Sequence, residues 1–98
     1  MLSFLRNFWR GRRLDHLQIV LYTRQGCHLC EEAWRLLQKE QARWHFLLEI
    51  VDIDTNCTLA AQFGDQVPVV TVNGEVRFWG KINPVLLTRL LRAEPKKG

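Results

Sequence analysis

Short continuous runs of apolar residues alternate along the chain with stretches in which apolar residues recur at helical spacing. Residues 17–22 and 46–53 are two such runs, rich in β-branched and aromatic side chains, and they predict two buried strands. Between them, apolar and charged positions separate onto two faces, which predicts a helix of about a dozen residues that opens at Cys27 and Cys30. Its apolar face comprises Leu29, Ala33, Trp34, Leu36 and Leu37. Because a strand, a helix and a strand form a βαβ unit, the two strands are expected to be parallel.

A second, shorter helix is expected directly after the second strand. Asp54 or Thr55 is expected to cap it, and the helix then runs through Phe63 and ends at Gly64. The favoured role of the neighbouring carboxylates Asp52 and Asp54 is capping at the end of the strand, because no metal-ligating partners accompany them.

A hairpin follows the second helix. Residues 67–72 predict a third strand, and residues 75–79 predict a return strand. The dipeptide Asn73-Gly74 between them is a strong sequence signal for a tight hairpin turn.

The last element is expected to be a helix. Asn83 can cap it, and Pro84 occupies its first position. Its apolar stripe comprises Leu86, Leu87, Leu90 and Leu91. The predicted order is therefore β-α-β-α-β-β-α, an α/β arrangement.

Composition is consistent with one packed domain. The chain has 98 residues, of which 47% are hydrophobic and 24% charged, and residues 16–93 carry the whole pattern of elements. We expect residues 1–15 to form a basic, amphipathic extension and residues 94–98 a polar tail. No run approaches the 18 or so apolar residues of a membrane span. Residues 1–13 alternate apolar residues with arginines and lack the continuous apolar stretch and the small-residue cleavage site of a secretory signal, so none is expected.

The net charge of +4 is concentrated at the two ends of the chain. Residues 1–15 carry four arginines and one acid, and residues 77–98 carry six basic residues and one acid. The central part lacks the interleaved basic and aromatic residues of a nucleic-acid binder, so no nucleic-acid partner is expected. Contact of residues 1–13 with a membrane surface is the less favoured alternative to a frayed tail or to a helix packed on the domain.

Three cysteines cannot form a fully paired disulfide scaffold, which favours a reducing compartment, the cytoplasm. Cys27 and Cys30 form a Cys-x-x-Cys pair between the first strand and the first helix. A structural zinc site would need two further ligands, and Cys57 and the three histidines do not repeat the paired spacing of a zinc ribbon. A Cys-x-x-Cys pair beside a βαβ pattern indicates a redox centre.

The position of the pair assigns a role to each sulfur. Residues three apart lie on one side of a helix, close enough for a disulfide to form. At the helix N-terminus, unpaired backbone N–H groups and the helix dipole are expected to lower the pKa of Cys27. Arg24, and His28 when protonated, would act in the same direction. Cys27 is therefore the predicted nucleophile, and Cys30 is the predicted resolving thiol.

Four motifs in this order resemble the thioredoxin fold and, within it, the glutaredoxin-like family of small bacterial domains. They are Leu-Tyr-Thr-Arg-Gln-Gly-Cys-His-Leu-Cys, Val-Asp-Ile-Asp, Val-Pro-Val-Val-Thr-Val-Asn-Gly and the glycine before the last helix, over about residues 17–91. The resemblance implies a central four-stranded mixed sheet flanked by helices and thiol–disulfide oxidoreductase activity. It also implies that Pro68 is cis and faces the reactive cysteine, where the Val67 backbone would pair with an extended thiol substrate.

Departures from the family pattern concern glutathione. The pair reads Cys-His-Leu-Cys rather than Cys-Pro-Tyr-Cys, and Trp79-Gly80 stands where a Gly-Gly is usual. Arg24 matches the basic residue that family members aim at a glutathione carboxylate. The predicted substrate-binding residues are therefore Arg24, His28, Val67, Pro68 and Gly80. The favoured partner is a disulfide-containing protein, with a glutathione mixed disulfide as the alternative and glutathione as a candidate co-substrate.

Two other classes of function stay open for the same fold. One is a module that holds an iron–sulfur cluster or a metal between two copies through Cys27. The other is a non-catalytic adaptor. We expect a monomer without a resident metal or cofactor. Cys57 is expected to be a semi-exposed helix residue, and Trp34 and Trp44 are expected to pack in the core.

Overall fold

A mixed sheet with the strand order β2-β1-β3-β4 organises residues 14–94, the part of the chain described by the computed structural model. The central strand β1 (Gln18–Thr23) pairs in parallel with β2 (Leu47–Asp52), which confirms the predicted βαβ unit. On its other side, β1 pairs antiparallel with β3 (Val69–Val72), and β3 continues into the antiparallel β4 (Glu75–Trp79). Asn73 and Gly74 both adopt positive φ angles, of 50° and 86°, as a tight hairpin turn requires.

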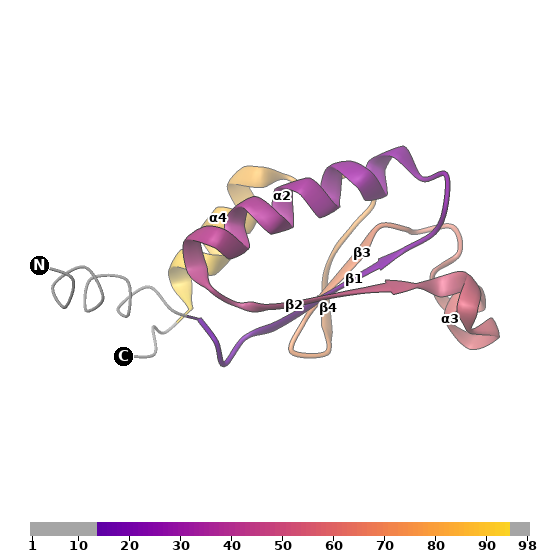
Figure 1. Ribbon diagram of the computed structural model, residues 1–98, viewed down its shortest axis with the longest axis horizontal. Coiled ribbons are helices and arrows are strands. Elements are labelled where there is room, and N and C mark those ends of the chain that lie inside the picture. Colours follow the sequence, from indigo (N-terminus) through magenta and orange to yellow (C-terminus); the bar gives the residue numbers. More distant parts are fainter. Residues whose placement is uncertain (1–13, 95–98) are drawn as a thin grey trace, which may run out of the picture.

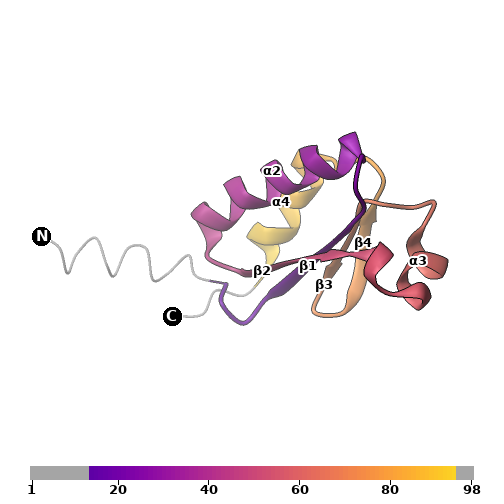
Figure 2. The same cartoon turned by 45° about the vertical axis from the view of Figure 1, so that its right-hand side comes forward.

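The two longest helices, α2 (His28–Trp44) and α4 (Pro84–Ala93), lie side by side over one face of the sheet (Figures 1 and 2). The short helix α3 (Cys57–Phe63) lies near one end of the sheet, and a single 3-10 turn, η1 (Ile53–Thr55), leads from β2 into it. The predicted α/β order, β-α-β-α-β-β-α, is therefore confirmed, with the 3-10 turn added. Within residues 14–94, no helix is both long enough and apolar enough to cross a bilayer.

Buried side chains form two clusters because alternate strand residues point to opposite faces of the sheet. Leu21 and Val70 belong to the larger cluster, under α2 and α4. Their neighbours Tyr22 and Val69 belong to the smaller cluster, together with Phe63 of α3. The rings of Tyr22 and Phe63 lie 4.9 Å apart, so α3 is anchored to the face that the two long helices leave open.

The prediction that residues 46–53 form a buried strand is wrong for much of β2. Phe46 and Ile53 are buried, but Leu47 is 54% exposed and Ile50 is 48% exposed. The physical reason is position, because β2 is an edge strand and only β1 lies beside it.

Three helix details also differ from the sequence-based expectation. Asn56 caps α3, and its Oδ1 accepts the N–H groups of Thr58 and Leu59, whereas Asp54 and Thr55 lie in the 3-10 turn. Helix α2 has 17 residues rather than about a dozen. In α4, Leu86 is exposed although it was assigned to the apolar stripe.

The predicted ends of the chain fall largely beyond the described range. Residues 1–13, with their possible membrane contact, and residues 95–98 lie outside it, so these expectations stay predictions. Leu14 is fully buried in the larger cluster, and its N–H donates to the carbonyl of Trp44 at 2.8 Å.

Candidate functional site: the Cys27–Cys30 centre

Cys27 is the N-cap of α2. Its backbone is extended (φ −94°, ψ 105°), and its Sγ accepts the backbone N–H of Cys30 at 3.1 Å. This contact satisfies one of the N–H groups that a helix start leaves without an intrahelical partner. The sulfur thus occupies the position at which backbone donors and the helix dipole stabilise negative charge.

The two cysteines are joined by a disulfide, with their Cα atoms 5.1 Å apart. This confirms the expectation that the pair can bridge. The two residues differ in accessibility, because Cys30 is 3% exposed and Cys27 is partly exposed. An incoming group can therefore reach Cys27 more easily than Cys30.

An open cleft of about 320 Å³ adjoins the pair on the side of the edge strand. The loop from Thr23 to Cys27 forms one wall, and α2 contributes Cys30, Glu31 and Trp34. β2 contributes Ile50 and Asp52. Trp34 packs against the core, as predicted, and also lines this cleft.

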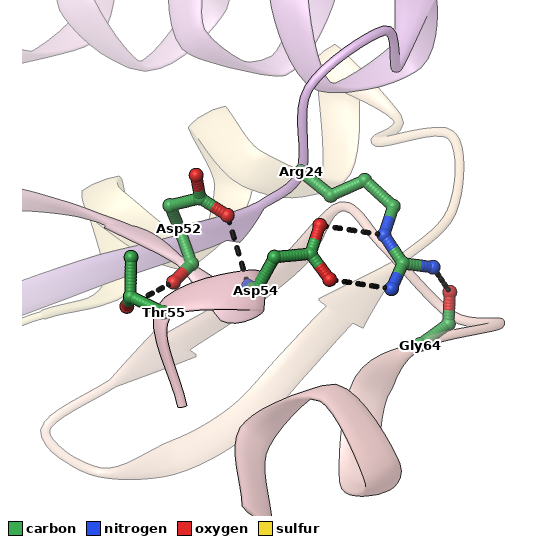
Figure 3. Close-up of polar contacts among 5 residues, drawn as sticks. All are labelled: Arg24, Asp52, Asp54, Thr55 and Gly64. Atoms are coloured by element: carbon green, nitrogen blue, oxygen red, sulfur yellow. Dashed lines mark hydrogen bonds and ion pairs between the residues drawn. The ribbon is translucent and has the colours of Figure 1, made fainter. Parts of the chain in front are cut away.

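Arg24 is held by two other segments of the chain (Figure 3). Its Nε and Nη2 donate to the Oδ2 and Oδ1 of Asp54 at 3.2 and 2.8 Å, and its Nη1 donates to the carbonyl of Gly64 at 3.0 Å. The hydrogen bond from Arg24, followed by its charge, lowers the pKa of Asp54, and the same contact raises the pKa of Arg24. The loop before Cys27 is thereby tied to the 3-10 turn and to the end of α3.

This geometry bears on two sequence-based assignments. The predicted substrate contact of Arg24 stays a prediction, since its three hydrogen bonds go to the chain itself. The carboxylates divide their roles: Asp52 Oδ1 caps the 3-10 turn by accepting the N–H of Asp54 at 2.9 Å. The prediction that Asp54 caps is wrong, because its carboxylate binds Arg24 instead.

The other predicted substrate-binding residues gather at the same end of the sheet. The peptide bond between Val67 and Pro68 is cis. Since Tyr22 pairs with Val69 in antiparallel register, Pro68 lies beside Thr23, at the start of the loop that leads to Cys27. Gly80 is adjacent, because its N–H donates to the carbonyl of Pro68 at 2.8 Å and its φ is 68°.

His28 and Cys57 occupy exposed positions. His28 is the first residue of α2, directly beside Cys27. Cys57 is a free, exposed thiol at the first residue of α3. Within residues 14–94, no three His, Cys, Asp or Glu side chains form a group that could hold a metal ion.

Sequence reasoning did not identify five residues that shape this site, one of which is Asp52, expected as a cap and not as a cleft residue. Asp54 was not recognised as the partner of Arg24, and Glu31, Trp34 and Ile50 were not recognised as cleft residues. These contacts join segments that are far apart in the chain, so no local pattern marks them. A periodicity argument places Trp34 on the apolar face of its helix, but it does not indicate that the end of that face borders the cysteine pair.

The fold and the site define a class, a thioredoxin-fold protein with a Cys-x-x-Cys pair at the start of a helix. The structure matches a thioredoxin of Halobacterium salinarum with a TM-score of 0.62 and 18% identity, covering 85% of this chain and 77% of that one. The chain belongs to the Glutaredoxin-like domain (DUF836) family, whose model matches residues 18–92.

Two relatives are more similar in sequence. Protein Ne2328 of Nitrosomonas europaea is 30% identical with a TM-score of 0.66, and the match covers 76% of this chain and 89% of that one. The uncharacterized protein Mb0520 of Mycobacterium bovis is 34% identical over 68 residues, which are 63% of this chain and 70% of that protein. Neither name states an activity.

Proposed function

We propose that this protein is a thiol–disulfide oxidoreductase in which Cys27 is the nucleophile and Cys30 the resolving thiol. The observation that carries the proposal is the N-cap geometry of Cys27. An accessible sulfur accepts a backbone N–H at a helix start, and a buried sulfur lies within disulfide distance behind it. The same donor that now contacts the sulfur would stabilise a thiolate after reduction.

The reaction proceeds in two exchanges that balance in atoms and electrons. The Cys27 thiolate attacks one sulfur of a substrate disulfide, and the other substrate sulfur leaves as a thiolate that takes up a proton. Cys30 then loses its proton and attacks the Cys27 sulfur, which closes the protein disulfide and releases the second substrate thiol. Two electrons pass to the substrate, and a low-molecular-weight thiol or a dithiol protein restores the reduced pair.

The start of β3 is the proposed docking point for the substrate backbone. Within the described residues, the N–H and C=O of Val67 have no hydrogen-bond partner, and they lie next to the cis Pro68. Gly80 supports this segment through its bond to the Pro68 carbonyl. The favoured substrate is a disulfide-containing protein, and we propose that the protein acts as a monomer in the cytoplasm without a resident cofactor.

A redox titration tests the proposal most directly. A Cys57→Ser background leaves only the two relevant thiols, which can be counted by alkylation and mass spectrometry after equilibration with dithiothreitol buffers. We expect one reversible two-electron transition. A pair that forms no reversible disulfide would refute the mechanism.

Trapping tests the division of roles. In the same background, Cys30→Ala should accumulate a mixed disulfide on residue 27, because the resolving thiol is missing. Cys27→Ala should accumulate little, because Cys30 is buried. Equal trapping by the two variants would show that the assigned order of attack is wrong.

A further inference from the structure

The cleft beside Cys27 has an unbalanced negative charge. Glu31 of α2 and Asp52 of β2 both line it. Among the lining residues that lie within the described range, Arg24 is the one cationic side chain, and Asp54 neutralises it at 2.8 Å. The carboxylates of Glu31 and Asp52 therefore dominate the field that a group entering the cleft would meet.

Two apolar side chains, Trp34 and Ile50, face the loop of residues 23–27 across the cleft. Ile50 is 48% exposed on the edge strand, and Trp34 is partly buried against the core. These two side chains can contact the aliphatic part of a ligand, while the carboxylates interact with its charged end.

We infer that this cleft selects the class of disulfide that reacts at Cys27. It favours disulfides that carry a cationic group on a short aliphatic arm and disfavours those that carry carboxylates. Glutathione belongs to the disfavoured class because its two carboxylates outweigh its single ammonium group and leave it with a net negative charge. The inference rests on the proposed function and adds a substrate class to it.

A set of small symmetrical disulfides of matched size tests the inference. They are cystamine, which is cationic, 2-hydroxyethyl disulfide, which is neutral, and 3,3′-dithiodipropionate, which is anionic. The fully reduced protein reacts with each in a single turnover, so its own dithiol supplies the two electrons. Each rate constant is divided by that of dithiothreitol with the same disulfide, which removes the intrinsic reactivity of the reagent.

We expect the normalised rates to fall in the order cationic, neutral, anionic. Two nearby carboxylates and a reversal of ligand charge correspond to roughly tenfold between the extremes at low ionic strength. In about 1 M salt the ratio should approach one, because exposed charges are screened.

Substitutions locate the effect in the cleft. Glu31→Gln and Asp52→Asn should each reduce the cationic-to-anionic ratio by about threefold, and Asn keeps the oxygen that accepts the N–H of Asp54. The matched control is Glu32→Gln, the next residue of the same helix, which lines a different pocket and should leave the ratio unchanged. His28→Gln in parallel measures any contribution of the exposed imidazole next to the pair.

The ratio is informative because a change in Cys27 acidity alters the rates with all three reagents together and cancels. Equal normalised rates, or a preference for the anionic disulfide, would overturn the inference while the oxidoreductase assignment stands. An unchanged ratio in both cleft variants would also overturn it. Failure to react with any of the three disulfides would refute the proposed function, and the inference with it.

Discussion

Leu86 and Leu87 are consecutive leucines in α4, and the structure separates them sharply. Leu87 is 0% exposed, and Leu86 is 47% exposed. Replacing each by alanine makes the same chemical change on the same helix, with the same gain in helix propensity. The two variants therefore measure burial alone.

The magnitudes follow from what each side chain contacts. Leu87→Ala leaves a cavity in the core beneath α4 and should reduce the free energy of unfolding by about 3 kcal/mol, within the usual range of about 2–5. For a domain of this size, that loss lowers Tm by roughly 12–24 °C. Leu86→Ala removes methyl groups that are half in water and leaves no enclosed cavity, so its cost should stay below about 1 kcal/mol.

Urea denaturation followed by circular dichroism measures both free energies, with each protein held in the disulfide form. Equal m-values would show that the two unfolding reactions expose similar surface and can be compared directly. Losses within about 0.5 kcal/mol of one another, or a larger loss for Leu86→Ala, would refute the assigned burial of α4.

Three further substitutions test polar contacts. Asp54→Asn should destabilise the protein at neutral pH, because Arg24 lowers the folded-state pKa of Asp54. The ionised Asp54 carboxylate therefore stabilises the fold at pH values above its ordinary pKa of 3.8, and this stabilisation is lost as the pH falls through the folded-state pKa. Unfolding midpoints that differ equally at pH 7 and at acid pH would contradict this. Asn83→Ala should cost about 1 kcal/mol because it removes the acceptor of two N–H groups at the start of α4, and Asn83→Asp should restore most of the loss in the same thermal assay. Glu40→Ala should cost about 1–3 kcal/mol by leaving the buried Trp44 indole N–H without its carboxylate acceptor at 3.0 Å, whereas Glu40→Gln should cost less in urea titrations; equal losses would argue against the bond.

Local sequence signals were sufficient to predict turns and helix starts whose geometry is set by a few consecutive residues. Asn73-Gly74 specified the hairpin, and Asn83-Pro84 specified the start of α4, because turn and cap geometry is decided within a few residues. The position of Cys27 at the start of a helix followed from the same kind of reasoning. Asn56 was missed as a cap because Asp54 and Thr55, which are also favourable cap residues, precede it.

The end of α2 shows a limit of local signals. The helix continues to Trp44 and ends at His45, which adopts the left-handed conformation (φ 61°) and donates its N–H to the Gln41 carbonyl. Glycine is the usual residue at such a helix end, so nothing in the sequence marked it. Asn and His adopt this conformation at a lower frequency than glycine.

The sequence by itself determined the order of the elements, the turns and the placement of two cysteines one helical turn apart, because these depend on side-chain periodicity and short-range hydrogen bonds. Only the tertiary structure decided that β2 is an edge strand and that Leu86 faces water. It also decided that Arg24 binds Asp54 and that Glu31, Asp52, Trp34 and Ile50 border the accessible sulfur. The physical reason is that burial and ion pairing depend on which distant segments meet, and a one-dimensional pattern records only the neighbours along the chain.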